Sequence, residues 1–250
     1  MPNIWLINQF ANTPDLPGHT RQYDIAKYLV ENGWEVEVFA SDFNLSERRY
    51  TKLKKFHFKK TQIFNGIKWH WIWAAPYKKN NWKRYFNLLS FCIHLGVRVF
   101  VKKILLVKFF KKLSKPDIIL ASSPQLPAAF ICLIFAKILK KPFILEVRDL
   151  WPQVLIDQSN AKENGFLIKL LTKMEIKLYQ EADHVIVLAN GCINYVKDRG
   201  AKNVTFLPNG PDLNVFKKVD IPNNIKSFDN QNPFKILYSG AHGESNNLSN

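Results

Sequence analysis

Side chains that could do chemistry follow one short hydrophobic run, residues 142–146. The apolar and aromatic residues of this run favour a buried strand, and Pro152 predicts a turn or a helix start after it. Glu146, Arg148 and Asp149 lie within four residues of one another at the end of the run. Because loops at such strand ends line the ligand crevice of open α/β sheets, we predict a site here. A structural ion pair or a helix cap made by Arg148 and Asp149 is the alternative.

Alternating strand and helix patterns surround this candidate site. Periodicity predicts strands at residues 3–7, 35–40, 117–121, 142–146, 184–188 and 203–207, and helices at 20–32, 126–140, 166–181 and 192–199. Strands that alternate with helices of this length form βαβ units and a mostly parallel sheet. We therefore expect an α/β, Rossmann-like fold.

The composition changes after Pro208. Residues 220–233 are rich in Asn, Asp and Pro and predict a linker, and a new strand at 234–239 then runs into a glycine-containing loop. A second nucleotide-binding domain would open in this way, although a complete one needs about 100 further residues. We expect a first domain over 1–215, a linker over 216–233 and only the first strand of a second domain within 234–250.

The positive charge of the chain is concentrated in one window. The net charge is +16, and residues 48–116 hold 19 Lys and Arg but no Asp or Glu. Such a field attracts nucleic acid, an anionic membrane or a phosphate-bearing substrate. The window also holds an alternating set (Ile67, Trp69, Trp71, Trp73) and an aromatic set among basic residues (Trp82, Tyr85, Phe86). Both suit a lipid headgroup interface, although RNA stacking needs a similar composition and a solvated basic face is the plain alternative.

No segment has the pattern of a membrane span or a signal peptide. Three basic residues interrupt the apolar window 87–107, and at helical pitch its charges point to all sides, so it predicts neither a spanning nor an amphipathic helix. The run 126–135 is too short to span and predicts a buried helix. Residues 1–7 lack a basic start and a long apolar core. We expect a soluble cytoplasmic protein that lies peripherally on an anionic membrane surface.

The cysteines and histidines do not form a recognisable ligand set. The three cysteines are far apart in the sequence, and the six histidines show no metal-ligand spacing. We therefore expect no disulfide framework and no metal site, and a reducing compartment.

Five segments occur together in an order typical of one enzyme family. They are 17–21 (PGHTR), 122–124 (SSP), 146–152 (EVRDLWP), 207–216 (LPNGPDLNVF) and 238–243 (YSGAHG). With them the chain resembles the N-terminal half of a family 4 glycosyltransferase with the GT-B fold. It is similar in particular to the branch that includes bacterial L-fucosamine transferases of O-antigen and capsule synthesis.

The resemblance implies a retaining, hexosyl-type transfer from a nucleotide-diphosphate sugar, which we expect to be UDP-linked, without a metal or another cofactor. The acceptor would be a membrane-linked glycan or a polyprenyl diphosphate, held by the first domain on the inner face of a bacterial membrane. Donor and phosphate contacts would come from Gly18, His19, Arg21, Asn209, Gly210, Gly240 and Gly243.

Two of these donor-side residues have a physical reason to bind a diphosphate. Gly18, before a predicted helix, lets backbone N–H groups approach the phosphates, whose charge the helix dipole favours. Arg21 could add a cationic contact. A plain turn explains Gly18 equally well. Family members usually have a second glycine where this chain has His19, and an imidazolium there could compensate.

The resemblance also implies roles for the residues after the 142–146 strand. Arg148 and Asp149 stand where many members have His-Asp and would be catalytic, since they would orient the transferred sugar and the acceptor hydroxyl. Glu146, Trp151 and Ser123 would lie on the acceptor side, with anchoring of the loop as the alternative for Glu146.

The donor-domain motifs of the family, a basic pair and a Glu-seven-residues-Glu motif, do not occur in this sequence. We therefore expect the chain alone to bind donor poorly, as a truncated enzyme or as one chain of two. A non-catalytic acceptor-binding or scaffold subunit that needs a separate donor-domain partner is the alternative function. A nucleic-acid-binding protein is disfavoured because no binding module is recognisable, and an oxidoreductase because no Gly-x-Gly-x-x-Gly follows the first strand.

Overall fold

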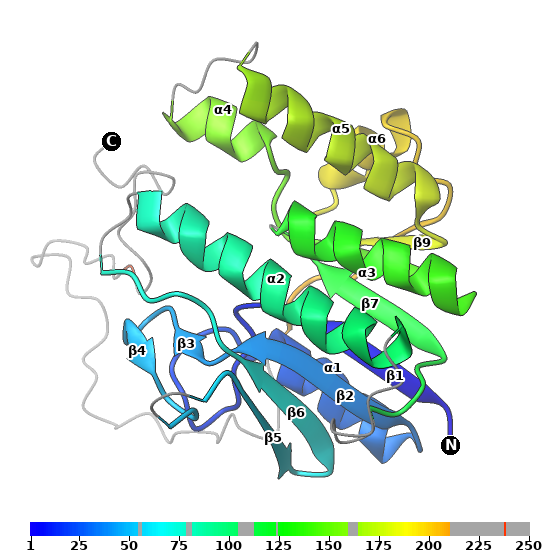
Figure 1. Cartoon of the computed structure of the whole chain (residues 1–250). Coiled ribbons are helices and arrows are strands. Elements are labelled where there is room, and N and C mark those ends of the chain that lie inside the picture. Colours follow the sequence, from blue (N-terminus) through cyan, green and yellow to red (C-terminus); the bar gives the residue numbers. More distant parts are fainter. Residues whose placement is uncertain are drawn as a thin grey trace, which may run out of the picture.

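The structure is a computed structural model that describes residues 1–54, 57–78, 82–104, 113–123, 125–159 and 165–210, together with Tyr238. These residues form one large sheet, a small two-stranded ribbon and flanking helices (Figure 1). The strands are β1 (Asn3–Ile7), β2 (Glu35–Ser41), β3 (Phe43–Asn44), β4 (Arg49–Tyr50), β5 (Lys59–Phe64), β6 (Ile67–Ile72), β7 (Ile118–Ser122), β8 (Phe143–Val147), β9 (His184–Val187) and β10 (Val204–Phe206). The helices are α1 (Arg21–Glu31), α2 (Trp82–Ile104), α3 (Leu126–Leu139), α4 (Gln153–Ser159), α5 (Phe166–Glu181) and α6 (Cys192–Asp198).

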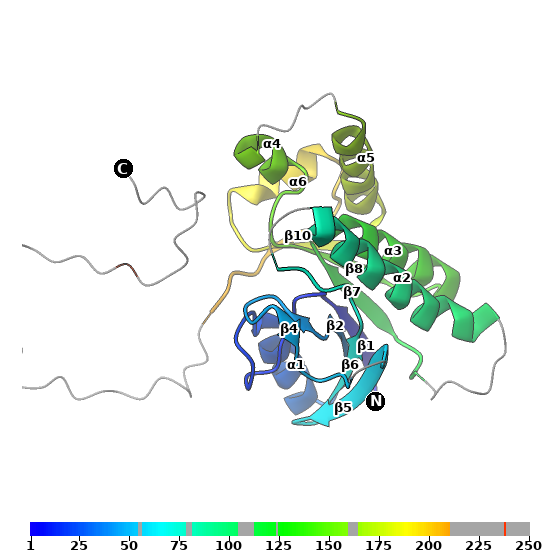
Figure 2. The same cartoon turned by 60° about the vertical axis from the view of Figure 1, so that its left-hand side comes forward.

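The large sheet has the strand order β10-β9-β8-β7-β1-β2-β6-β5, and its neighbouring strands are parallel except for β5 against β6. The chain proceeds from β1 to β2 in one direction and from β7 through β10 in the other. Right-handed crossovers therefore place α1 on one face and α2, α3 and α5 on the opposite face, as Figures 1 and 2 show. This confirms the mostly parallel, Rossmann-like α/β fold that the sequence predicts.

The face beneath α2, α3 and α5 holds the larger core. Trp5 of β1 stacks on Phe135 of α3, with 5.5 Å between the ring centroids. Leu145 of β8 and Tyr179 of α5 are buried in the same cluster. Helix α3 is apolar on most of its sides because it is enclosed by the sheet and by its neighbours. The prediction of a buried helix at this place is confirmed.

The opposite face packs beneath α1 and contains two tryptophans that the sequence interpretation placed differently. Trp69 and Trp71 of β6 are 0% exposed and stack on each other at 5.2 Å. Their assignment to a headgroup interface is wrong. Parallel pairing of β6 with β2 turns Ile67, Trp69 and Trp71 to the face that α1 covers, where they join its core. Trp73, beyond the end of the strand, is half-buried.

The edge of the sheet is a hairpin that sequence reasoning missed. Asn65 and Gly66 both have positive φ, 48° and 77°, and connect β5 to β6 in a tight turn. Strand β5 begins Lys-Lys-Thr-Gln and lacks the apolar alternation that marks a half-buried strand. Its lysines protect an exposed sheet edge from pairing with another chain.

The sequence pattern of residues 87–107 predicted neither a membrane-spanning helix nor an amphipathic helix. In the structure, the residues of this window up to Ile104 belong to the long helix α2. No helix within the described ranges has both the length and the apolar character that a membrane crossing requires. The predicted linker and second-domain strand, with Gly240 and Gly243, lie outside the described residues. The proposed boundaries at 215 and 233 therefore stay predictions.

Candidate active site

A cleft of about 600 Å³ runs along α1 at the carboxyl end of β8. Three distant segments line it: the loop that enters α1, the loop after β8 and the segment that follows β10. Six of the residues predicted for the site lie on its walls: Gly18, His19, Arg21, Arg148, Asn209 and Gly210. They converge because parallel strands end at one edge of the sheet, where β8 is flanked by β7 and β9.

The entry loop of α1 requires glycine at position 18. Gly18 has a φ of +133°, and a Cβ atom there would lie 2.5 Å from Asn12 Nδ2. The loop is held from behind, because the Asn12 N–H donates to the His19 carbonyl at 3.1 Å and Asn44 Nδ2 donates to the Pro17 carbonyl at 2.9 Å. Gly18 therefore lets the backbone pass close to a fixed polar neighbour while its other side faces the cleft.

Arg21 fastens the carboxyl-terminal wall of the cleft to the sheet. Its Nε donates to Glu146 Oε1 at 2.8 Å, and its Nη2 donates to the Leu207 carbonyl at 2.9 Å. Its Nη1 donates to the Pro208 carbonyl at 2.9 Å and to Asn209 Oδ1 at 3.2 Å. The sequence predicted a cationic contact to phosphate from this residue. In the structure its donors are directed at this chain's own acceptors, so Arg21 shapes the site.

Glu146 is the buried partner in this arrangement, with its side chain 0% exposed. Its Oε2 accepts hydrogen bonds from Gln22 Nε2 at 2.8 Å and from the Ser122 hydroxyl at 2.7 Å. A buried carboxylate needs such partners, because an unpaired charge in the interior is costly. This geometry matches the anchoring alternative for Glu146. A direct role on the acceptor side stays a prediction.

The loop after β8 is held by Ser123. Its hydroxyl accepts the Arg148 N–H at 3.0 Å and donates to the Asp149 carbonyl at 3.3 Å. Trp151 is half-buried and packs against the larger core. Ser123 and Trp151 thus fix the backbone that carries Arg148 and Asp149, while their predicted acceptor contacts stay untested.

The polar side chains at the mouth of the cleft influence one another electrostatically. Partial burial lowers the pKa of His19, the positive charge of Arg148 lowers it further, and Asp149 opposes both effects. The shift favours a neutral imidazole at neutral pH, so it works against the compensating imidazolium that the sequence analysis proposed for His19. Arg148 is half-buried and Asp149 is exposed. Arg148 lines the cleft, whereas Asp149 is not among the lining residues, although its charge acts on His19.

The amino end of α1 opens into the same cleft. The side chain of Thr20 does not cap the helix and instead donates to Asp24 Oδ2 at 3.3 Å. Thr20 and Asp24 line the cleft, as does Tyr28 one turn further along. A helix amino terminus favours negative charge, so an anionic group such as a phosphate suits this end. Sequence reasoning missed Asp24 and Tyr28, although their spacing of four residues on a predicted helix places them on one side.

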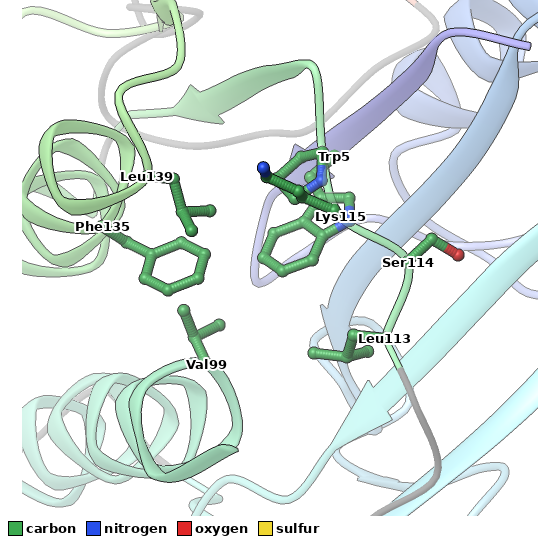
Figure 3. Close-up of a pocket in the computed structure, with 8 residues that line it drawn as sticks. Trp5, Val99, Leu113, Ser114, Lys115, Phe135 and Leu139 are labelled. Atoms are coloured by element: carbon green, nitrogen blue, oxygen red, sulfur yellow. The ribbon is translucent and has the colours of Figure 1, made fainter. Parts of the chain in front are cut away.

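A second, smaller pocket differs in character. It has a volume of about 290 Å³ and opens between α2 and α3 beside Trp5 and the segment before β7 (Figure 3). Val99, Phe135 and Leu139 give it an apolar lining, and Lys115 is the one ionisable side chain on its described walls. It lies away from the carboxyl edge and holds no pair of groups that could move a proton.

Residues 18–210 match the glycosyl transferase 4-like domain. This chain belongs to that family. The match begins at Gly18 and ends at Gly210, which are both walls of the 600 Å³ cleft. The family domain therefore contains every described segment that lines the cleft.

Several solved structures are similar to this glycosyltransferase domain at low sequence identity. A sucrose-phosphate synthase structure from Thermosynechococcus elongatus has a TM-score of 0.50 at 13% identity, over 83% of this chain and 89% of that chain. HepE from Anabaena, in complex with UDP and glucose, has a TM-score of 0.48 at 15% identity over 86% of this chain. UGT89C1 from Arabidopsis thaliana has a TM-score of 0.47 at 14% identity over 84% of this chain.

The chain spans about half the length of two of these structures, 46% of HepE and 51% of UGT89C1. The comparison with curated protein sequences gives no match. Within the described residues, no group of three or more His, Cys, Asp or Glu side chains is arranged to hold a metal ion. The family and the fold of the domain are thus established, and its substrates are proposed from them.

Proposed function

We propose that this domain serves a glycosyltransferase that moves a hexosyl-type sugar, with retention, from a nucleotide-diphosphate sugar to a lipid-linked acceptor. The acceptor is a membrane-linked glycan or a polyprenyl diphosphate used in O-antigen or capsule synthesis, as in the fucosamine-transferase branch that the sequence resembles. The protein acts at the cytoplasmic face of an anionic membrane. Family membership and the polar cleft support this proposal.

One observation carries the proposal: Gly18, Arg148 and Asn209, from three distant segments, line a single cleft. The amino end of α1 and the guanidinium of Arg148 supply positive potential for a phosphate group. Asp149 and the neutral imidazole of His19 supply polar groups that can orient a hydroxyl. Transfer then depends on positioning and on stabilising the leaving diphosphate.

A nucleotide-binding measurement on the full chain tests the cleft. We expect weak binding of UDP, measured by ligand-observed NMR, and we expect Arg148→Ala to weaken it about tenfold because a charge-assisted contact is lost. Lys169→Ala, an exposed position on α5, is the matched control and should leave binding unchanged. Equal binding by the Arg148→Ala variant and the native chain would show that the cleft does not recognise the diphosphate.

A transfer assay distinguishes the proposed enzyme from an alternative function. Our alternative is an acceptor-binding subunit whose donor domain is a separate polypeptide. A radiolabelled-sugar assay with the chain alone should give little or no product, and addition of a donor-domain partner should restore it. Robust turnover by the chain alone would contradict both the requirement for a second domain and the subunit alternative.

A further inference from the structure

The outward side of α2 is apolar along its described length. Seven of its residues are exposed: Trp82, Lys83, Tyr85, Phe86, Leu89, Ile93 and Val97. All but Lys83 are aromatic or aliphatic, with exposed fractions between 47% and 69%. We call these six residues the α2 stripe. Their spacing of three or four residues puts them on one side of the helix, while Phe91, Leu95 and Val99 face the core.

A groove of about 410 Å³ runs beside the stripe, between α2 and the edge strand β5. Val97 belongs to both the stripe and the groove, and Phe58, 57% exposed, stacks on His94 at 5.5 Å between ring centroids. Lys59 and Arg98 give the groove its positive charge. Nε of Arg98 has no hydrogen-bond partner among the described residues. The groove thus combines an apolar wall with cationic groups.

The charge around the stripe indicates what covers it. Residues 48–116 contain no Asp or Glu, so every ionisable acidic side chain is missing from α2 and β5 themselves, and the charged residues of these two elements are Lys and Arg. A second copy of the chain would bring the same positive surface against it, which costs electrostatic free energy. Residues 207–210 lie beside α1, where Arg21 holds them on the other side of the sheet from α2.

An anionic bilayer meets all of these features at once. Aromatic side chains such as Trp82 and Tyr85 partition to the headgroup level, and aliphatic ones such as Leu89 and Ile93 enter the acyl boundary. Lysines at the border gain from the negative surface potential. The amino end of α2 lies toward the carboxyl edge of the sheet, so a membrane on the stripe is near the edge that carries the cleft (Figure 1).

We propose that the α2 stripe inserts into the interface of an anionic membrane and that the groove beside it accepts the phosphate of a lipid headgroup. This inference rests on the proposed function, because membrane docking would serve to bring the cleft close to a lipid-linked acceptor. Docking itself is measured without nucleotide or transfer. Failure of docking and failure of the proposed function are therefore separate results.

Co-sedimentation of the full chain with vesicles tests the stripe. We compare vesicles of phosphatidylcholine alone with vesicles containing phosphatidylglycerol. The native chain should bind the anionic vesicles, and Leu89→Ser combined with Ile93→Ser should lower the partition coefficient at least about tenfold, because two buried aliphatic side chains are lost. The matched control is Leu167→Ser combined with Leu170→Ser on α5, two exposed leucines on a helix separated from α2 by α3. The control should bind like the native chain.

A charge reversal tests the groove. Lys59→Glu should weaken binding to anionic vesicles about tenfold, because two units of charge change at the bilayer surface. Lys169→Glu on α5 makes the same change in net charge and should have a much smaller effect. Circular dichroism spectra of all variants should match the native chain, which separates lost docking from lost folding.

Three outcomes would overturn the proposal. Equal losses in the α2 and α5 variants would mean that binding depends on general apolar or basic character. Undiminished binding by the Leu89→Ser and Ile93→Ser variant would exclude the stripe. A dimer in analytical ultracentrifugation that this variant converts to a monomer would assign the stripe to a second copy of the chain.

Discussion

At the scale of single residues, the site is organised by a buried ion pair. Arg21 and Glu146 are 125 positions apart in the sequence, and the structure joins them at 2.8 Å with 10% and 0% of their side chains exposed. Through this pair, the amino end of α1, the end of β8 and the segment after β10 become one unit. The sequence shows both residues in family motifs, but it does not show that they contact each other, because the contact depends on the crossover that brings α1 beside β8.

Replacing Arg21 with lysine tests this unit. Lysine keeps the charge but lacks the planar fork, so it cannot reach Glu146 and three acceptors at 207–209 together. We expect Arg21→Lys to lower the free energy of unfolding by about 2–3 kcal/mol, measured by urea denaturation.

The control for this prediction is Arg49→Lys. Arg49 makes an ion pair with Glu47 at 2.5 Å, but its side chain is 68% exposed. An exposed pair contributes about 0–1 kcal/mol, so the control should change stability by less than that. Similar effects of the two substitutions would show that the Arg21 contacts do not hold the cleft together.

At the scale of elements, a polar network fastens the edge of the sheet to α2. Glu37 of β2 accepts hydrogen bonds from His70 Nε2 of β6 at 2.7 Å and from Lys68 Nζ at 3.0 Å. Nη2 of Arg98, on α2, donates to His70 Nδ1 at 2.7 Å, and the Thr61 hydroxyl of β5 lies 3.0 Å from the same atom. A neutral imidazole with its proton on Nε2 donates to Glu37, and the lone pair of its Nδ1 accepts the Arg98 N–H, which also donates to the Thr61 hydroxyl at 3.1 Å.

This network predicts a loss of stability in acid. Burial lowers the pKa of His70, and its hydrogen bond to Glu37 opposes the shift. For Glu37, burial raises the pKa, but the hydrogen bonds from His70, Ser114 and Lys68 outweigh it and leave a pKa of about 2 against an ordinary value of 4.5. Both groups bind fewer protons when folded. The contribution of this network to the unfolding free energy should therefore be constant above about pH 7, start to fall as the pH drops below 6.5, and fall further between pH 4.5 and 2.

Glu37→Gln separates the two contributions. From the shift of Glu37 alone, about 3 kcal/mol of stability should disappear between pH 4.5 and pH 2 in the native chain, and this part should be missing in the variant. Glu35→Gln, an exposed position on the same strand, should keep the native profile. The measurement is urea denaturation at a series of pH values. An unchanged acid limb in Glu37→Gln would show that the carboxylate is not held by the network.

The bounds of individual elements show what the sequence could and could not predict. Strand β1 and helix α5 have the predicted bounds, because apolar periodicity decides both. Strand β5 was not predicted because its residues show no alternation of apolar and polar side chains. The tryptophans of β6 were assigned to the wrong environment because periodicity does not say which face of a strand is covered. Helix α2 has apolar residues on both its core side and its exposed side. For this reason its sequence does not show which side faces the core.

At the scale of the whole molecule, segments that are far apart in the sequence come together in one cleft. With the resemblance of ordered motifs, the sequence predicted that Gly18, Arg21, Arg148 and Asp149 border one groove. Gly18, Arg21 and Arg148 do line a single cleft, but Asp149 is not among its lining residues, and the functional roles stay predictions. The sequence did not predict that Arg21 and Glu146 satisfy each other, since local patterns carry no information about contacts between distant segments. The packing of both cores and the Arg21 contacts lie within residues 1–210.

Shortened chains test this view. A chain that ends at residue 210 keeps β10 and every acceptor of Arg21, so we expect its free energy of unfolding to equal that of the full chain within about 0.5 kcal/mol. A chain that ends at residue 203 loses β10 and leaves the guanidinium of Arg21 with Glu146 alone. We expect it to be less stable by about 3 kcal/mol or more, since the pairing of β10 with β9 is lost and the Arg21 guanidinium loses three acceptors. Urea denaturation of the three chains measures both differences. The opposite result would be a chain ending at 210 that is as unstable as the chain ending at 203. Residues after 210 would then contribute to the stability of the domain, and its folded unit would extend past the family match.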